Sequence, residues 1–131
     1  DALTDYAAAH SDVMLLTADL GFSVLERFRD RCPDQFMNVG VAEQAMIGIA
    51  AGLALAGRRV AVYSIANFPT LRCLEQIRND VCYHNLPVVV IAVGRGLFWD
   101  AQLRLRHYSP RKISAPVAIV FQSFTPYMLT H

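Results

Sequence analysis

Short apolar runs alternate along this chain with stretches of helical spacing, and this alternation limits the possible fold more than any other feature of the sequence. An uninterrupted apolar run is typical of a strand that is buried on both faces. Strands that alternate with helices predict a parallel sheet with right-handed crossovers. We therefore expect an α/β fold, with an open, mostly parallel β-sheet flanked by helices. The predicted strands are residues 13–17, 36–39, 59–65 and 87–93, with a last one at 116–121, and the predicted helices are residues 3–9, 24–31, 43–56 and 71–83.

The composition indicates one domain with more apolar surface than a monomer needs. Hydrophobic residues make up 54% of the 131 residues and charged residues 18%, against about 45–50% and 25% in typical soluble domains. Surplus apolar surface usually becomes an interface. The longest nearly uncharged apolar run, residues 45–57, is shorter than the roughly 20 residues that cross a bilayer, and no signal-peptide pattern opens the chain. We expect a single domain over residues 1–131 and no membrane partner.

The cysteines and the charge distribution narrow the class of protein further. Cys32, Cys73 and Cys82 form no CxxC pair, so reduced thiols in the cytoplasm are expected rather than disulfides or a zinc site. Residues 1–57 carry a net charge of −5 and residues 58–131 a net charge of +6. The total of +1 gives no reason to expect a nucleic-acid partner. A basic cluster after the last clear strand either holds phosphate groups or is a solvated loop; its members are Arg95, Arg104, Arg106, Arg111 and Lys112.

The segment Asn38-Val39-Gly40-Val41-Ala42-Glu43-Gln44 lies where chemistry is expected. It follows a predicted strand, and open α/β sheets bind their ligands at the carboxyl ends of the strands. Glu43 falls in the first turn of a helix that is almost entirely small or apolar. A lone carboxylate in such surroundings is desolvated, which suits an acid that transfers a proton. A solvated glutamate at an ordinary helix start is the other interpretation, and composition alone leaves both open.

Two further features are open to more than one interpretation. Phe68 follows a strand and precedes a helix, so its ring either projects over the edge of the sheet as a stacking platform or belongs to the core. Gly48 and Gly52 lie four residues apart on the long predicted helix. They allow close contact, either by packing on the sheet or across a two-fold axis.

Two stretches resemble a known family. They read NVGVAEQAMIGIAAGLALAG and VYSIANFPTLRCLEQIRNDVCYHNLPVVVIAVG. Both strongly resemble the pyrimidine-binding domain of transketolase-like enzymes, over roughly residues 3–94. The resemblance is closest to the C-terminal subunit of split bacterial and archaeal transketolases, because the deoxyxylulose-phosphate synthases share the Ala-Glu-Gln turn but differ around the second stretch.

The resemblance implies a thiamine-diphosphate-binding fold whose cofactor lies between two chains or domains. Glu43 takes the place of the family glutamate that hydrogen-bonds the aminopyrimidine ring and activates the cofactor. Phe68 takes the place of the aromatic side chain that stacks on this ring. Gln44 and Arg72 fall in the same cofactor-binding region, with Arg72 toward the substrate side. Asp19 is similar to a family acid near the dimer centre.

The sequence departs from the family pattern in two places. No Gly-Asp-Gly followed by a distant Asn is present, so the Mg²⁺ and diphosphate contacts that this motif makes in the family are expected from a partner. The tail, residues 95–131, lacks the Gly-Pro-Thr-His-like motif. His107 falls near the place of its catalytic histidine but without the other residues of the motif. We expect this C-terminal part to be diverged and truncated, because relatives continue past residue 131.

The predicted function is the pyrimidine-binding half of a thiamine-diphosphate-dependent transketolase, which moves a two-carbon ketol unit between sugar phosphates and is inactive alone. Its expected partners are a diphosphate-binding N-terminal subunit and a second copy of the chain. The alternative is a non-catalytic remnant that folds and dimerises without completing an active site. The predicted catalytic residues are Glu43 and His107, the predicted cofactor-binding residues are Glu43, Asp19, Gln44, Phe68 and Arg72, and no metal ligand is expected.

Overall fold

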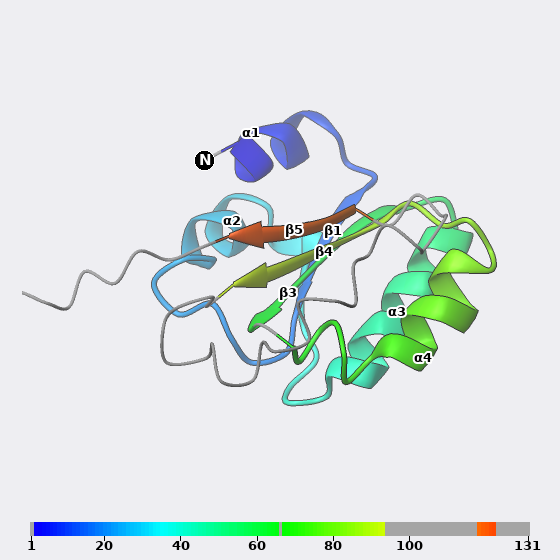
Figure 1. Ribbon diagram of the computed structural model, residues 1–131. Coiled ribbons are helices and arrows are strands. Elements are labelled where there is room, and N and C mark those ends of the chain that lie inside the picture. Colours follow the sequence, from blue (N-terminus) through cyan, green and yellow to red (C-terminus); the bar gives the residue numbers. More distant parts are fainter. Residues whose placement is uncertain (1, 66, 94–117, 123–131) are drawn as a thin grey trace, which may run out of the picture.

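The computed structural model describes residues 2–65, 67–93 and 118–122 (Figure 1). Helices and strands alternate through these ranges, as the apolar runs predict. The predicted tail motif around His107 and the basic cluster lie outside the described residues. The elements are α1 (Ala2–Ala9), β1 (Val13–Thr17), α2 (Glu26–Arg31), the 3₁₀ turn η1 (Pro33–Gln35), β2 (Phe36–Asn38), α3 (Glu43–Leu55), β3 (Arg59–Ile65), α4 (Leu74–Gln76), the π-helical segment η2 (Ile77–Cys82), β4 (Val88–Val93) and β5 (Ala118–Gln122).

The strands form one sheet in the order β2-β1-β3-β4-β5, and all four pairings are parallel. The expected α/β class with a parallel sheet is confirmed. The last strand, predicted at 116–121, lies at Ala118–Gln122 and pairs with β4. The chain leaves β1 to form β2 on one side of it and then returns to form β3 on the other side. This reversal places the carboxyl ends of β1 and β3 side by side.

Both faces of the sheet are buried, which explains the uninterrupted apolar runs. Alternate residues of each strand point to opposite faces. In β1, Met14 and Leu16 pack with α3 and η2, whereas Val13 and Leu15 pack with α1 and α2. Figure 1 shows α3 and α4 together on one side of the sheet, with α1 and α2 on the other.

α3 closely matches its predicted range, but its glycines point away from the sheet. Gly57, with φ of 89°, ends the helix, and its N–H lies 3.0 Å from the Ala54 carbonyl oxygen. Gly48 and Gly52 are exposed, and no neighbouring atom lies within 4 Å of where a Cβ would be. Packing of this glycine pair on the sheet is therefore excluded. The stripe that packs on the sheet carries larger side chains and alanines: Met46, Ile47, Ala50, Ala51 and Ala54.

The helix predicted over residues 71–83 is wrong in its first and last parts. Residues 67–73 form turns, and the N–H of Arg72 donates to the Asn67 carbonyl five residues back, at 3.0 Å. The N–H of Tyr83 likewise bonds five residues back, to Arg78. Bonds of this spacing wind the chain more widely than an α-helix does, and such π-turns often occur near functional sites. Apolar spacing alone does not distinguish this winding from the α-helical one.

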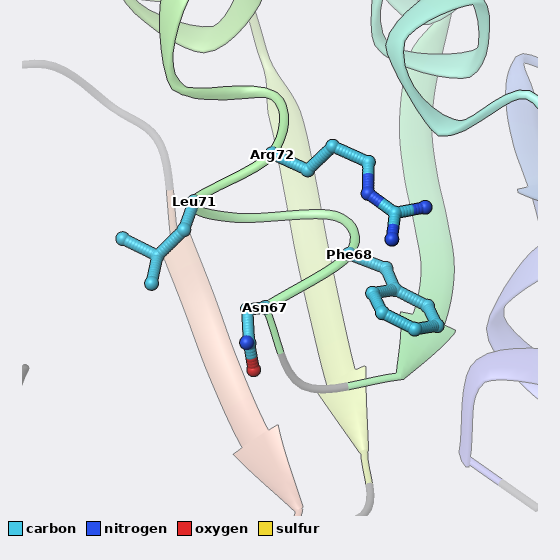
Figure 2. Close-up of a pocket in the computed structure, with 4 residues that line it drawn as sticks. All are labelled: Asn67, Phe68, Leu71 and Arg72. Atoms are coloured by element: carbon cyan, nitrogen blue, oxygen red, sulfur yellow. The ribbon is translucent and has the colours of Figure 1, made fainter. Parts of the chain in front are cut away.

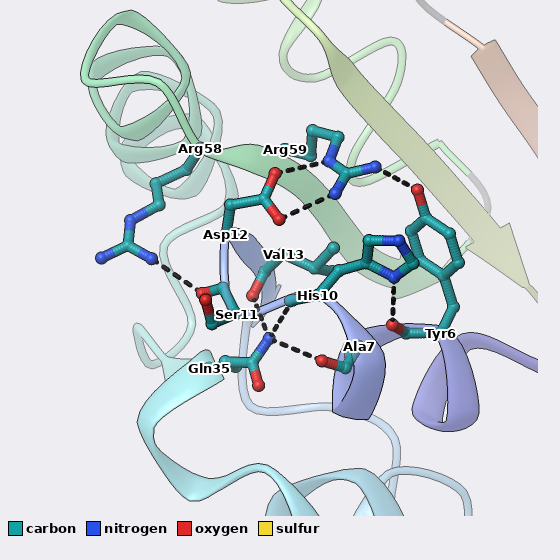
Figure 3. Close-up of polar contacts among 9 residues, drawn as sticks. All are labelled: Tyr6, Ala7, His10, Ser11, Asp12, Val13, Gln35, Arg58 and Arg59. Carbon is teal, nitrogen blue, oxygen red and sulfur yellow. Dashed lines mark hydrogen bonds and ion pairs between the residues drawn. The ribbon is translucent and has the colours of Figure 1, made fainter.

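An arginine holds the amino ends of β1 and β3 together (Figure 3). Arg59, the first residue of β3, donates two hydrogen bonds to the Asp12 carboxylate, at 2.6 and 2.7 Å. Its guanidinium also bonds the Tyr6 hydroxyl and lies 5.2 Å from the centroid of that ring. His10 stacks on the same ring. The fork geometry of arginine suits this two-bond contact with a carboxylate.

A glutamine makes a second connection at the same end of the sheet (Figure 3). The side-chain amide nitrogen of Gln35 lies 2.8, 2.9 and 3.2 Å from the carbonyl oxygens of Val13, His10 and Ala7. Three carbonyl oxygens, from the last part of α1 to the first residue of β1, therefore share one donor group. This contact fixes that part of the chain against η1, immediately before β2.

The part of the chain that the structure describes holds no helix with both the length and the apolar character needed to cross a bilayer. The three cysteines are unpaired; Cys32 and Cys73 are buried and Cys82 is half-buried.

Candidate functional site

The candidate site lies at the carboxyl ends of β1, β2 and β3. In the strand order found here the chain reverses between β1 and β3, and open α/β sheets bind ligands at such a switch point. The segment after β1 carries Asp19, the segment after β2 leads into Glu43, and the segment after β3 carries Phe68. The sheet topology thus brings three predicted residues from distant parts of the sequence to one edge.

Glu43 is buried and paired. It is the first residue of α3, where the helix dipole favours a negative charge, and it is only 4% exposed. Its Oε2 lies 3.2 Å from Nη1 of Arg72. The interpretation of Glu43 as a solvated glutamate at a helix start is wrong, and so is the expectation of a lone carboxylate. Arg72 supplies the partner that a buried charge needs.

The Arg72 side chain also joins Glu43 to Phe68. The guanidinium carbon lies 4.1 Å from the centroid of the Phe68 ring, a stacking distance. Figure 2 shows the guanidinium alongside this ring. Phe68 is half-buried and belongs to neither core cluster. It is therefore not an ordinary core residue, and its role as a stacking platform for a ligand stays a prediction.

An open pocket of about 400 Å³ lies over this turn. Four residues line it, Asn67, Phe68, Leu71 and Arg72, as Figure 2 shows. One wall is aromatic, one is aliphatic, and the remaining two side chains are polar. The turn after β3 thus exposes both apolar and polar side chains, with Phe68 and Arg72 on one side of it and Leu71 on the other, as Figure 2 shows.

Gln44 and Cys73 hold the turn that carries Phe68 and Arg72. The Gln44 amide donates to the Arg72 carbonyl oxygen at 3.1 Å, and the Cys73 thiol lies 3.1 Å from the Phe68 carbonyl oxygen. Burial raises the pKa of Cys73 to about 11, and the nearby Glu43 charge acts in the same direction, while Arg72 opposes it. Cys73 is therefore a protonated thiol at neutral pH, and its position is structural.

Asp19 is held by Asn38, the last residue of β2. The Asn38 Oδ1 accepts from the N–H groups of Asp19 at 2.9 Å and of Gly40 at 3.0 Å, and its amide nitrogen lies 3.2 Å from Asp19 Oδ1. Asp19 has φ of 55°, a conformation that costs energy for a residue other than glycine. Asn38 thus organises the segments after β1 and β2 together.

Comparisons with known proteins agree with this geometry. Residues 1–107 match the family model described as transketolase, pyrimidine binding domain. This match covers most of the chain. The chain belongs to the transketolase pyrimidine-binding domain family.

Individual relatives of this pyrimidine-binding domain carry several names. A 1-deoxy-D-xylulose-5-phosphate synthase of Mycobacterium sp. (strain KMS) is 41% identical over 98 residues, which is 74% of this chain and 15% of that protein. One of the subunits of an apulose-4-phosphate transketolase from Phocaeicola vulgatus is 36% identical over 115 residues, 87% of this chain and 36% of that protein. A putative transketolase C-terminal section of Methanocaldococcus jannaschii is 39% identical over 98 residues, 74% of this chain and 31% of that protein.

A solved structure supports the same assignment. It is described as a split gene transketolase, inactive beta4 tetramer, and superposes with a TM-score of 0.63 at 34% identity, over 70% of this chain and 31% of that one. The chain therefore spans between 15 and 36% of the length of these relatives.

The pyrimidine-binding domain brings four of the predicted site residues together: Glu43, Gln44, Phe68 and Arg72. Asp19 lies at the same end of the sheet, and its polar contacts within the described residues run to Asn38. His107 lies outside the described residues. The sequence reasoning missed Asn38 and Cys73 as supports and the ion pair between Arg72 and Glu43. Asn38 opens the turn motif, so its place at a strand end could have indicated its role.

The residues present suit a planar ring with hydrogen-bonding groups on its edge. The planar guanidinium of Arg72 already stacks on Phe68 while it donates to Glu43. The distance between Phe68 and Glu43 therefore suits a flat group that stacks on the ring and bonds the carboxylate. In the described ranges no three His, Cys, Asp or Glu side chains gather where a metal ion could bind.

Proposed function

We propose that this chain is the pyrimidine-binding half of a thiamine-diphosphate-dependent transketolase, which transfers a two-carbon ketol unit between sugar phosphates together with a partner. The observation that carries the proposal is that Phe68 lies against the face of the planar Arg72 guanidinium while Glu43 pairs with its edge. An aminopyrimidine ring is planar and presents nitrogen groups on its edge, so it would stack on Phe68 and bond with Glu43. Thiamine diphosphate supplies the carbanion chemistry of the reaction when it is bound.

The role of Glu43 in this proposal is to hold or share a proton at its carboxylate. Its burial at the start of α3 excludes water, so a hydrogen bond with a ring nitrogen there is stronger than in solvent. Phe68 orients the ring by stacking. Gln44 and Cys73 act through the turn, because both bind its backbone carbonyls and fix where Phe68 and Arg72 lie.

The partner in this proposal is a diphosphate-binding N-terminal transketolase subunit that also provides Mg²⁺. One relative is named as a subunit of a transketolase and another as a C-terminal section of one, which is consistent with a site shared between chains. Mg²⁺ is bound by carboxylates together with substrate phosphates. The side chains gathered around Arg72 offer the pyrimidine contacts and one carboxylate, so the remaining ligands are assigned to the partner.

We further propose that the domain forms a homodimer through the outer face of α3. On this face Gly48 and Gly52 leave open space, and the neighbouring Ile49 and Leu55 are 38% and 64% exposed. Small residues beside exposed aliphatic ones allow two helices to approach closely, and two-fold dimers are the commonest assembly. The proposed location is the cytoplasm, which the three unpaired cysteines support.

A second candidate function uses the same half-site. The 41% identity with a 1-deoxy-D-xylulose-5-phosphate synthase favours a domain of that enzyme. The assembled protein would then form 1-deoxy-D-xylulose 5-phosphate instead of exchanging ketol units between sugar phosphates. Product analysis of the assembled protein separates the two activities.

The test of the proposed function is the change Glu43→Ala, measured in the presence of the partner subunit. We expect turnover to fall by at least about 100-fold, the lower range for a general acid–base group. The fold is expected to remain intact, because Arg72 is 47% exposed and becomes solvated when its partner is removed. Glu75→Ala changes an exposed glutamate of α4 and serves as the matched control, with unchanged turnover. Turnover that survives Glu43→Ala contradicts the proposal. A folded wild-type chain that shows no turnover with any partner subunit favours the non-catalytic remnant.

A further inference from the structure

Arg72 makes, with one side chain, both contacts that the proposed function assigns to the pyrimidine ring. Its guanidinium lies 4.1 Å from the Phe68 ring centroid, and its Nη1 lies 3.2 Å from Glu43 Oε2. At 4.1 Å the two planar groups are in van der Waals contact, so no ring fits between them. The platform face and the carboxylate are thus both engaged by a residue of the chain itself.

The chemistry of the two groups explains why one can stand in for the other. A guanidinium is planar, carries N–H donors on its edge and stacks on aromatic faces. An aminopyrimidine is also planar and presents an N–C–N edge. Both therefore satisfy an aromatic platform and a buried carboxylate at the same time.

We propose that Arg72 is a placeholder in the pyrimidine site, which stacks on Phe68 and pairs with Glu43 until the ring displaces it. This inference rests on the proposed function. The placeholder keeps the buried carboxylate paired and the aromatic face covered. The pyrimidine ring must then compete with Arg72. Only the chains in which Arg72 has left the site can bind the ring, so the apparent affinity falls in proportion to their fraction.

Only the side chain of Arg72 has to move in this exchange. Its backbone is fixed by two hydrogen bonds, from the Gln44 amide to its carbonyl and from its own N–H to the Asn67 carbonyl. The side chain itself is 47% exposed, so it can turn into solvent through a change of rotamer. The platform and the carboxylate keep their places while the site changes its occupant.

The experiment measures the binding of thiamine, which has the aminopyrimidine but no diphosphate, to the full chain by NMR titration. In Arg72→Met the competing side chain is removed, and we expect thiamine to bind about tenfold more tightly than to wild type. In Arg72→Lys the charge remains but the planar stacking group is lost, and an intermediate affinity is expected. Arg78→Met removes an exposed arginine of η2 and controls for the change in net charge, with the wild-type affinity.

A second readout follows Arg72 directly and does not depend on the variants. Stacked on Phe68, the Nε–H signal of Arg72 is shifted by the ring current, and saturation with thiamine should abolish that shift. Equal or weaker binding by Arg72→Met, or an Arg72 signal that thiamine leaves unchanged, overturns the placeholder while the proposed pyrimidine binding stands. Absence of thiamine binding to wild type and to both Arg72 variants also overturns the placeholder, whereas the proposed function is tested separately by the turnover of Glu43→Ala with the partner subunit.

Discussion

The two ends of the sheet use polar side chains in opposite ways. At the amino end, Arg59, Asp12 and Gln35 pair with one another or with backbone carbonyls, and these contacts tie the starts of the strands together. At the carboxyl end, Glu43 and Arg72 form an ion pair beside an open pocket and a half-buried aromatic ring. The first set joins the starts of the strands, and the second set lies at the edge where we propose that a ligand binds.

The carboxyl end also contains features that cost stability. Asp19 and Ser23 have φ of 55° and 63°, which is unfavourable for residues other than glycine. The hydroxyl of Ser64, near the end of β3, is buried without a hydrogen-bond partner in the described part of the chain. Strain and unsatisfied groups tend to collect at functional sites, where the surrounding fold maintains them. Similar features also occur elsewhere, since Asn85 before β4 has φ of 55° and the Thr4 hydroxyl of α1 is buried without a partner in the described part of the chain, so they do not by themselves mark the site.

The largest effect is expected from a pair of phenylalanine changes, one at each end. Phe68→Ala removes the stacking platform, so the affinity of the assembled protein for thiamine diphosphate should fall about 10- to 100-fold. Phe36→Ala, at the start of β2, should instead lower the free energy of unfolding by about 2 kcal/mol, because this ring packs against the core that contains Phe28. Calorimetry and urea unfolding on both variants test this. A large loss of affinity for thiamine diphosphate in Phe36→Ala would show that the two ends of the sheet do not have separate roles.

Two glutamines provide a second matched pair. Gln35→Ala should destabilise the chain by about 2 kcal/mol, because three carbonyl oxygens lose their shared donor. Gln44→Ala removes one hydrogen bond, to the Arg72 carbonyl, and should cost about 1 kcal/mol or less while it weakens thiamine diphosphate binding. Unfolding curves rank the two variants. Equal destabilisation would show that the amino end is no more important for stability than the site.

The pH dependence of stability offers a third comparison. The hydrogen bonds from Arg59 hold the pKa of Asp12 below its ordinary value of 3.8. A depressed pKa contributes stability above the ordinary value, and this contribution is lost as the pH falls through the folded-state pKa. Asp12→Asn should therefore lower the Tm at about pH 6, and its difference from wild type should shrink toward about pH 3. A difference that stays constant over this range would contradict the role of the ion pair.

The last comparison concerns thiol reactivity, which stability measurements do not detect. Cys73 at the site is fully buried with its pKa raised to about 11, whereas Cys82, near the amino end of β4, is half-buried, although burial raises its pKa as well. The thiolate is the reactive form, so alkylation at about pH 8 should label Cys82 at least about tenfold faster than Cys73 in the folded chain. Mass spectrometry of the labelled peptides measures both rates. Rapid labelling of Cys73 would mean that the turn carrying Phe68 opens.

Much of the fold could be predicted because burial on both faces leaves a direct mark on the sequence. The run Val88–Val93 is apolar throughout, since one set of its side chains faces α3 and η2 and the other set faces the opposite layer. The order of the strands could not be predicted, because pairing depends on contacts between distant segments. The range 71–83 was misjudged as one helix, since the apolar spacing of Ile77 and Val81 suits an α-helix and the wider winding of η2 alike.

The site divides in the same way. The placement of Glu43 and Phe68 at one edge of the sheet could be predicted, because each follows a parallel strand. The contact between Glu43 and Arg72 could not, because 29 positions separate the two residues and only the folded sheet edge brings them together. Asn38 and Cys73 were missed because their roles depend on which backbone groups lie opposite them.

The proposed shared site is tested by a calorimetric titration of thiamine diphosphate with Mg²⁺, first into this chain and then into the chain with a diphosphate-binding N-terminal transketolase subunit. We expect no tight binding by the chain alone, because the residues that the structure describes offer contacts to the pyrimidine ring and no cluster of metal ligands, and tight Mg²⁺-dependent binding once the partner is present. Tight Mg²⁺-dependent binding by the chain alone would show a complete site within it and contradict the account, as would a complex with the partner that binds no cofactor.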